Sequence, residues 1–159
     1  VESQVGKGTS FTIYIPREIQ IKEIQESKYI TKSPESQNLG MNETILLVED
    51  DLAVRNLVIN ILKNQKFHLL FFEDPLEALT NIHENGTKVN LLITDIVMPH
   101  LNGRELYEQL IKEQPELKVL FMSGYTENIL SEEFKNRFIQ KPFSASQLLD
   151  KISEILKNS

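Results

Sequence analysis

The chain has no cysteine among its 159 residues, so disulfides, thiolate-bound zinc and cysteine nucleophiles are all excluded. Basic residues are in the minority, with 17 Lys and Arg against 23 Asp and Glu and a net charge of −6. A nucleic-acid groove needs clustered cations, so this acidic balance argues against one. No apolar run approaches the roughly 18 residues of a membrane span, and no basic segment followed by an apolar one marks a signal peptide.

Length and composition divide the chain into three parts. At about 150 residues per domain, we expect one globular domain with an appendage. Residues 1–16 are typical of the end of a β-hairpin, with a Gly-Lys-Gly turn before an alternating strand at Thr9–Ile15. Residues 17–43 are rich in Gln, Lys, Glu and Ser without a sustained period, which predicts a flexible linker. Residues 44–159 form the domain, and the start at Val1 in place of Met predicts a fragment of a longer protein.

Short apolar runs alternate with helical patterns across the domain and predict five βα units. The strands are expected at residues 45–48, 67–72, 91–94, 119–122 and 138–140. Strands this continuously apolar belong in a parallel sheet covered on both faces. Four phenylalanines are predicted to lie in the core: Phe67, Phe71, Phe72 and Phe121. The predicted fold class is α/β, a flavodoxin-like three-layer sandwich with strand order 2-1-3-4-5.

Polar side chains follow four of the five strands directly. They are Glu49 and Asp50 after the first strand, Asp95 after the third, Ser123 after the fourth and Lys141 after the fifth. In an open parallel sheet, ligands bind beyond the carboxyl ends of the strands, where the strand order reverses. With the order 2-1-3-4-5 the first and third strands flank that point, so their acids are expected to face each other.

Three carboxylates in one place repel each other unless a cation compensates them. Oxygen ligands without cysteine or a nearby histidine suit a hard ion, and Mg²⁺ is the best match. A site with Mg²⁺, a free carboxylate, a hydroxyl and an ammonium is equipped for transfer of a phosphoryl group to the carboxylate. Asp95 is the predicted nucleophile, because Glu49 and Asp50 sit together as a metal-holding pair.

These motifs resemble those of the response-regulator receiver domain over residues 44–157. The matching segments are ILLVEDD, LLITDIVMPHLNG, VLFMSGYT and FIQKPF, four motifs in the family's order and each at a strand end. The resemblance implies that Asp95 is the phosphoacceptor and that Ser123 and Lys141 contact the phosphoryl group. It also implies a cis peptide bond between Lys141 and Pro142. The implied Mg²⁺ ligands are Glu49, Asp50, Asp95 and the backbone carbonyl of Val97.

Three positions depart from the family's commonest pattern. Glu49 stands where Asp is usual, which lengthens one arm and predicts a metal contact through water. Phe138 occupies the switch-aromatic position where Tyr is frequent, so it can rotate inward but offers no hydroxyl. Val97 has no side chain that orients a hydrolytic water, which predicts a long-lived phosphoryl group. In the predicted switch, Ser123 moves toward the phosphoryl group and vacates space for Phe138.

The first residues resemble a second family. The segment GKGTSF within residues 1–16 is similar to the final hairpin of a histidine-kinase ATPase domain. The adenine-binding segment and the phosphoacceptor histidine of such kinases are missing, so ATP binding is not expected. The order of kinase remnant, linker and receiver implies a hybrid sensor histidine kinase, truncated at its N-terminus and with the receiver at its C-terminus.

The resemblance implies a role in a phosphorelay. The receiver is expected to take a phosphoryl group from a phosphohistidine onto Asp95 with Mg²⁺, and then to switch protein contacts or pass the group to a histidine phosphotransfer partner. The fragment is not expected to be an enzyme on its own, although a receiver catalyses its own phosphorylation. Its expected partners are a kinase phosphohistidine domain or a histidine phosphotransfer protein, without nucleic acid or membrane contact. It is expected in the cytoplasm, whether or not the parent kinase is anchored to a membrane. A homodimer through the face of the fourth helix, fifth strand and last helix also stays open.

Other interpretations compete at single positions. Aspartates after strands often cap helices, and we prefer that interpretation for Asp51 and Asp74. A flavodoxin needs a phosphate loop of Ser, Thr and Gly where Glu49 and Asp50 stand. An Asp-nucleophile phosphatase needs a second acid where Val97 stands. The serious alternative is a receiver fold that only docks partners, independently of phosphorylation.

Overall fold

The computed structural model describes residues 2–4, 6–10, 12, 43–124 and 132–157. By internal contacts the chain divides into two units, Val1–Glu35 and Ser36–Ser159. In the first unit, β1 (Glu2–Gln4) pairs antiparallel with β2 (Gly8–Ser10). The predicted hairpin is therefore present over these residues, while residues 11 and 13–15 of the predicted strand and residues 17–42 of the linker predicted at 17–43 lie outside the described residues.

Five parallel strands form the sheet of the second unit, in the order β4-β3-β5-β6-β7. They are β3 (Thr44–Val48), β4 (His68–Phe72), β5 (Leu91–Asp95), β6 (Lys118–Ser123) and β7 (Phe138–Gln140). Counted within this domain, the order is 2-1-3-4-5, as predicted, and it reverses between β3 and β5. The register pairs Val48 with Thr94, and Asp95 with Met122, so the carboxyl ends of the central strands meet at one edge.

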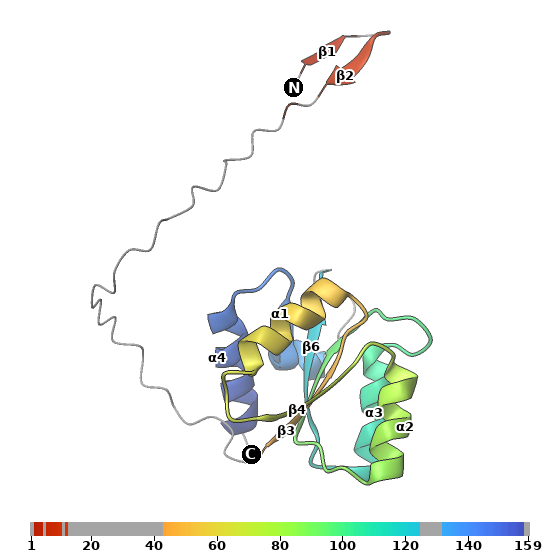
Figure 1. The fold of residues 1–159 in the computed structure, drawn as a ribbon, viewed down its shortest axis with the longest axis vertical. Coiled ribbons are helices and arrows are strands. Elements are labelled where there is room, and N and C mark those ends of the chain that lie inside the picture. The colour runs from red at the N-terminus through yellow and green to blue at the C-terminus, as the bar shows by residue number, and fades with distance from the viewer. Residues whose placement is uncertain (1, 5, 11, 13–42, 125–131, 158–159) are drawn as a thin grey trace, which may run out of the picture. The chain divides into compact units, whose positions relative to one another are not determined.

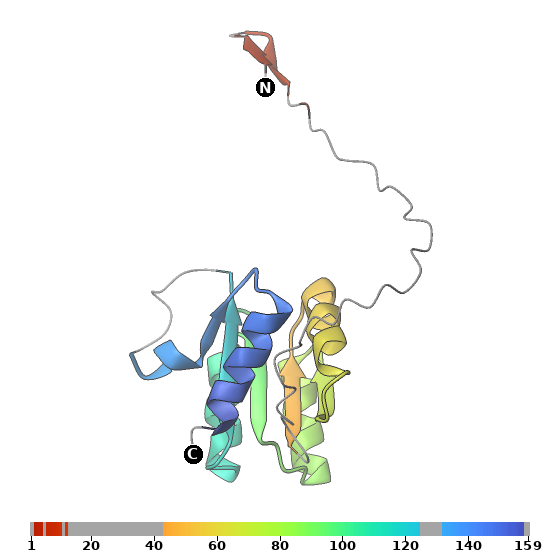
Figure 2. The same ribbon diagram turned by 90° about the vertical axis from the view of Figure 1, so that its left-hand side faces the viewer.

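Helices cover both faces of this sheet. They are α1 (Leu52–Leu62), α2 (Pro75–Asn85), α3 (Gly103–Glu113) and α4 (Ala145–Lys157). Helices α1 and α4 lie on one face and α2 and α3 on the other (Figure 1), and Figure 2 views the face with α1 and α4. The described part of the β6–β7 connection is a 3-10 helix, η1 (Glu132–Arg137), in the place where sequence predicts a fourth helix. Residues 125–131 of that connection lie outside the described residues.

The central strands are buried on both faces. In β3, Ile45 and Leu47 join the core cluster beneath α1 and α4, whereas Leu46 and Val48 join the cluster beneath α2 and α3. All four side chains are fully buried. Because a strand covered on both sides needs apolar residues at every position, the sequence shows a continuous run instead of an alternation.

The outer strand β4 differs from this pattern. Phe71 is 53% exposed, so the prediction that it lies in the core is wrong. The strand is the last in the sheet order and has a partner on one side only. A phenylalanine on such an edge can therefore lie outside the area that the neighbouring helix covers.

Side chains cap the helix starts where the sequence predicts it. One carboxylate oxygen of Asp51 accepts from the amides of Ala53 and Val54 at 2.8 and 3.0 Å, and Asp74 accepts from the Leu76 amide at 2.8 Å. These amides hold the pKa of the Asp51 carboxyl below its ordinary value, because they stabilise the charged form. Both aspartates thus act as N-caps, as predicted, and this role distinguishes Asp51 from the preceding acids Glu49 and Asp50.

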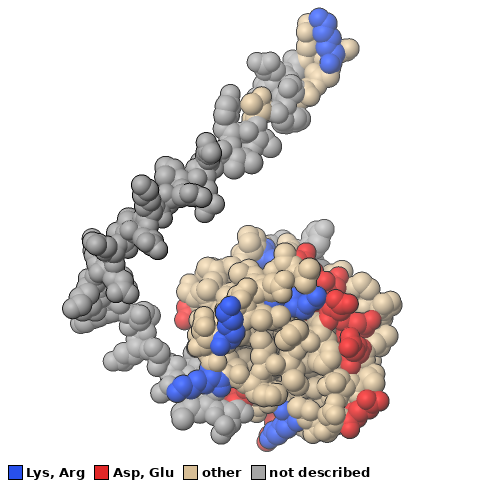
Figure 3. Space-filling model, in the orientation of Figure 1, with Lys and Arg blue, Asp and Glu red and all other residues tan. Residues whose placement is uncertain are grey.

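The surface accounts for most of the negative charge. Figure 3 shows acidic side chains gathered on the side of the domain where α2 and α3 lie. These two helices carry the exposed residues Glu77, Glu84, Glu105, Glu108 and Glu113. Among the described residues, no helix has the length and apolar character needed to cross a membrane.

Candidate functional site

Three carboxylates converge where β3 and β5 end. Glu49, Asp50 and Asp95 each offer one oxygen, and these oxygens all lie within 4.8 Å of one another. Glu49 follows β3 and is fully buried, Asp95 ends β5 with 16% of its side chain exposed, and Asp50 is exposed. The three predicted acids therefore meet at the point where the strand order reverses, although the adjacent pair Glu49 and Asp50 is divided between interior and surface.

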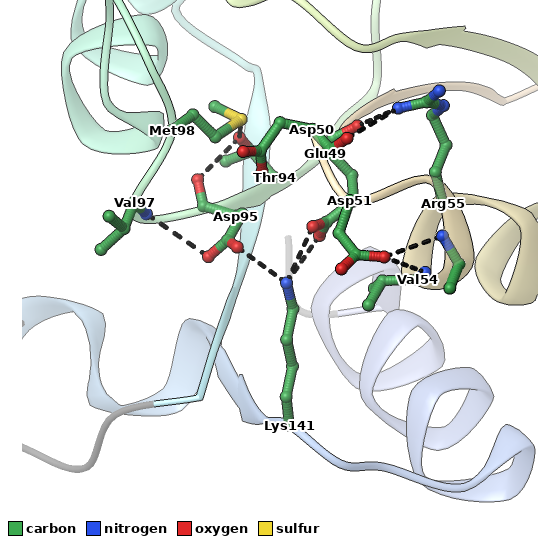
Figure 4. Close-up of polar contacts among 11 residues, drawn as sticks. Glu49, Asp50, Asp51, Val54, Arg55, Thr94, Asp95, Val97, Met98 and Lys141 are labelled. Carbon is green, nitrogen blue, oxygen red and sulfur yellow. Dashed lines mark hydrogen bonds and ion pairs between the residues drawn. The ribbon is translucent and has the colours of Figure 1, made fainter.

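The Lys141 ammonium joins two of these carboxylates (Figure 4). It donates to both oxygens of Glu49, at 3.0 and 2.7 Å, and to one oxygen of Asp95 at 2.7 Å. Burial alone would lower the pKa of Lys141, but its hydrogen bonds to Asp95 and Glu49 and the negative charges of these carboxylates raise that pKa above its ordinary value. Burial raises the pKa of Glu49, against the opposing effect of Lys141. Through these short contacts, the Lys141 ammonium forms ion pairs with two carboxylates, those of Glu49 and Asp95.

The loop after Asp95 is folded back onto the strand ends. The Val97 amide donates to the Asp95 carboxylate at 3.4 Å, and the Ile96 amide donates to the carbonyl of Met122 at 3.1 Å. The Val97 side chain is 60% exposed and stands at the rim of the acidic group. The nucleophile candidate is therefore held by its own loop while one side of it stays open to solvent.

Helix α3 starts against the carbonyl of Asp95. A Cβ atom at Gly103 would lie 2.0 Å from that carbonyl oxygen and 2.9 Å from two side-chain atoms of Thr94. Thr94 is fully buried, and its hydroxyl donates to the same carbonyl at 3.0 Å. Only glycine permits this approach, so the helix start contributes directly to the position of Asp95.

The two predicted switch residues lie on neighbouring strands. Ser123 ends β6 and is buried, and its backbone carbonyl accepts from the Lys141 amide at 2.8 Å. Phe138 begins β7, pairs in register with Phe121 and packs, partly buried, against the core beneath α2 and α3. The Lys141–Pro142 peptide bond is cis. Ser123 at the end of β6 is therefore joined by a backbone hydrogen bond to Lys141, and Lys141 lies three residues after Phe138 in the sequence.

One residue of the site escaped the sequence interpretation. Arg55 of α1 is buried and donates to the backbone carbonyls of Glu49 and Asp50 at 2.6 and 3.3 Å. Its position shares a helix face with Val58 and Leu62, which are both buried. A charged residue on an apolar helical stripe is the sequence signal that could have identified it.

The donor set fits a hard divalent cation. Carboxylate oxygens in one cluster, of which one is buried, match the ligands that Mg²⁺ prefers, and among the described residues no other group of acids or histidines has metal-binding spacing. An ammonium beside the same carboxylates provides a second positive charge for an anionic group. The arrangement can therefore bind a cation and a phosphoryl group next to one carboxylate that is able to act as nucleophile.

Comparison with known proteins gives the family. The response regulator receiver domain family matches residues 45–153. The chain is similar to the sensor kinase CckA of Brucella abortus (strain 2308), with 34% identity over 163 positions covering 98% of this chain and 17% of that protein's length. It is also 30% identical to the response regulator receiver protein CpdR of the same organism, over 70% of this chain and 95% of CpdR.

A solved structure agrees with these relatives. The crystal structure of the receiver domain from the hybrid histidine kinase CckA matches with a TM-score of 0.61 and 31% identity, over 72% of this chain and 99% of that chain. The residues that the family model matches, 45–153, run from the second residue of β3 past the end of β7 and include the acids, the hydroxyl and the lysine at the strand ends. The chain belongs to the response regulator receiver domain family of two-component phosphorelay systems.

Proposed function

We propose that this receiver accepts a phosphoryl group from a phosphohistidine onto the carboxylate of Asp95, with Mg²⁺ bound beside it. The observation that carries the proposal is the convergence of Glu49, Asp50 and Asp95 within 4.8 Å, with the Lys141 ammonium 2.7 Å from the Asp95 carboxylate. In the proposed reaction an Asp95 oxygen forms a bond to phosphorus, and the bond from phosphorus to the histidine nitrogen breaks. The histidine leaves with its electron pair.

The metal has proposed ligands on this chain. Asp50 and Asp95 would hold Mg²⁺ together with the backbone carbonyl of Val97, and Glu49 would contact it through water. When bound, Mg²⁺ neutralises the charge of the phosphoryl oxygens. Lys141 and the Ser123 hydroxyl would each bind a phosphoryl oxygen. In support of this assignment, Asp50 is exposed to incoming metal, whereas both oxygens of Glu49 are already bound to Lys141.

The proposed output is a change of the face near β7. A phosphoryl group adds a charge of about −1.5 to −2. Two charge-assisted hydrogen bonds, from Ser123 and Lys141, contribute roughly 1.5–3 kcal/mol each. Their sum is of the size needed to invert a ratio of two conformations from 1:99 to 99:1, about 5.5 kcal/mol. We expect Ser123 to move toward the phosphoryl group and Phe138 to turn inward into the vacated space.

The remaining residues suggest the parent protein and the partners. We propose that residues 1–16 are the end of a kinase ATPase domain, that residues 17–43 are a linker and that the receiver spans residues 44–159. The similarity to CckA supports this division, since it covers 98% of the chain and is not limited to the receiver. The partner would then be a kinase phosphohistidine domain or a histidine phosphotransfer protein.

Intact mass spectrometry tests the proposal. Incubation of the full chain with acetyl phosphate and Mg²⁺ should add the mass of one phosphoryl group, and Asp95→Asn should abolish the gain. Asp51→Asn is the matched control, because Asp51 is a helix cap two positions from Glu49 and should leave the gain intact. A gain that survives Asp95→Asn would refute the assignment of the acceptor. No gain in the wild-type chain would favour the phosphorylation-independent docking domain.

Nuclear magnetic resonance tests the switch separately. Beryllium fluoride can stand in for the phosphoryl group on Asp95, and the ring resonances of Phe138 should change when it binds with Mg²⁺. Phe67 provides a comparison, because it packs against the core beneath α1 and α4 on the opposite face of the sheet. Unchanged Phe138 resonances with the mimic bound would exclude this switch.

A further inference from the structure

Arg55 is the buried cation of the domain's acidic edge. Among the described residues, the buried charged side chains are those of Arg55 and Glu49. The Arg55 side chain is 10% exposed and reaches from α1 to the β3–α1 connection, where Nη1 donates to the backbone carbonyls of Glu49 and Asp50. Its Nη2 donates to the carboxylate of Glu73 at 3.1 Å. Glu73 follows β4 and is 70% exposed, so it supplies a counter-charge at the surface.

The geometry separates two kinds of contact on the acids. Arg55 contacts the main chain of Glu49 and Asp50, and its one carboxylate partner is Glu73. Lys141 contacts the carboxylates of Glu49 and Asp95 (Figure 4). The guanidinium therefore leaves the side-chain oxygens of the acidic group available for cations.

Two peptide carbonyls that both accept from Nη1 of one guanidinium have little freedom to turn. The guanidinium is planar and presents its donors in a fixed geometry, whereas an ammonium acts as a single point. The Glu49 amide adds a restraint from the other direction by donating to the carbonyl of Phe72 at 3.2 Å. The main chain at Glu49 is thus tied both to α1 and to the end of β4, and this determines the direction in which the acidic side chains leave it.

We infer that Arg55 is a positioning residue for the divalent-cation site, acting through the backbone carbonyls of Glu49 and Asp50. The inference rests on the proposed function, because it assigns the cation site to the acidic group. Arg55 touches neither the cation nor the phosphoryl group. Its role is to hold the acidic pair so that Asp50 points at Asp95 before the cation arrives, which lowers the cost of ordering the ligands.

Charge and positioning predict opposite results for substitutions of Arg55. If the positive charge alone mattered, Arg55→Met would remove a repulsion and bind a cation more tightly, while Arg55→Lys would bind as the wild type does. If positioning matters, both variants bind more weakly, because neither presents the two fixed, coplanar N–H donors of Nη1. The pair of variants therefore distinguishes the two effects by sign.

Titration of the full chain with Mn²⁺, followed by electron paramagnetic resonance of the free ion, measures the affinity directly. We expect Arg55→Lys and Arg55→Met each to weaken binding by about tenfold, the lower end of the range for groups that orient metal ligands. Glu73→Gln removes the counter-charge but keeps both carbonyl contacts, so it should stay within about twofold of the wild type. Arg104→Met is the matched surface control, since Arg104 pairs with Glu108 on the exposed side of α3.

Kinetics provide a second readout. With acetyl phosphate, the Arg55 variants should need a higher Mg²⁺ concentration for half-maximal phosphorylation, while the rate at saturating Mg²⁺ stays close to that of the wild type. A lower unfolding temperature with unchanged Mn²⁺ affinity would reduce Arg55 to a structural residue and overturn the inference. Failure of the proposed function looks different, because the wild-type chain itself would then neither bind Mn²⁺ nor gain phosphate.

A measurement on the wild-type chain covers the case in which both variants unfold. The guanidinium protons of Arg55 should exchange slowly with water, as observed by nuclear magnetic resonance, both before and after Mg²⁺ is added. The carbonyl carbon resonances of Glu49 and Asp50 should likewise change little on binding, since their hydrogen bonds persist. Fast exchange, or large carbonyl shifts with Mg²⁺, would show that the loop is arranged by the metal and not by Arg55.

Discussion

At the scale of single residues, the site depends on a balance between three acids and one ammonium. Glu49 is fully buried, and a buried carboxylate is tolerated only when it is paired or protonated. Lys141 supplies the pairing, and the same ammonium also reaches Asp95. Lys141 therefore neutralises the buried Glu49 carboxylate, and in the proposed function it also binds the phosphoryl group on Asp95.

Lys141→Met should therefore reduce the free energy of unfolding by about 3 kcal/mol, because it leaves the Glu49 charge buried and unpaired. Adding Mg²⁺ should recover part of the loss, since a divalent cation restores positive charge beside the carboxylate. The double variant Glu49→Gln/Lys141→Met should be more stable than Lys141→Met alone. Urea unfolding with EDTA and with Mg²⁺ measures each quantity, and equal losses in both conditions would contradict the expectation.

Val97 governs the predicted lifetime of the phosphoryl group. Its exposed apolar side chain stands at the rim of the site and cannot orient an attacking water. Val97→Asn should shorten the half-life of the phosphorylated protein by about a hundredfold, the lower end of the range for general acid–base assistance. Phosphate-affinity gels taken over time measure the half-life. Leu52→Asn is the matched control, since Leu52 is equally exposed at the start of α1 and should leave the half-life unchanged.

At the scale of elements, the start of α3 is built against the end of β5. Gly103→Ala should lower the free energy of unfolding by about 3 kcal/mol, because the new methyl group would overlap the carbonyl of Asp95. Gly124→Ala is the control, since among the described residues no heavy atom beyond its chain neighbours lies within 4 Å of the position its Cβ would take. Its stability should stay within about 0.5 kcal/mol of the wild type in thermal or urea unfolding. An equal loss in the two variants would mean that the contact at Asp95 is unimportant.

The start of α1 gives a pH dependence whose sign is set by Asp51. Its folded pKa is lowered from the ordinary value of 3.8 by the Val54 and Ala53 amides, so the charged form stabilises the fold. That contribution is fully present above pH 3.8 and is lost as the pH falls through the lower, folded pKa. Asn caps a helix as well but does not titrate. The stability difference between the wild type and Asp51→Asn should therefore be constant above this pH and shrink below it, in urea unfolding at a series of pH values.

The sequence was sufficient for the five strands, for the helices α1 to α4 and for the convergence of the acids, because all of these rest on local patterns. Buried central strands require continuous apolar runs, and the polar residues that follow them fall at the carboxyl edge whatever the details of packing. Exposure of Phe71 could not be predicted in the same way, because it depends on how far α1 reaches over the edge strand. Arg55 binds main-chain carbonyls, which leave no trace in the sequence beyond its place on an apolar stripe.

At the scale of the whole molecule, the described core belongs to one unit. Among the described residues, both core clusters are made of residues 45–155. In the same part of the chain, the two strands of the hairpin form a two-stranded sheet of their own. The division into units at residues 35 and 36 follows from this separation.

A chain that begins at Ser36 should accordingly unfold at the same temperature as the full chain, within about 2 °C, which is less than the shift that 1 kcal/mol would produce. The far-ultraviolet circular dichroism signal of the helices, recorded during heating, measures the unfolding temperature. A clearly lower midpoint for the shorter chain would show that residues 1–35 stabilise the receiver.

The tethered ammonium of Lys141 also has a consequence for the order of events in the life of the protein. Many small metal-binding domains fold only when their metal is present, and a chelator unfolds them. Here a side chain of the same polypeptide neutralises the interior acid, so folding can finish first and the ion can enter later. On the proposed function, the supply of Mg²⁺ would control the phosphorylation rate of a receiver that is already folded.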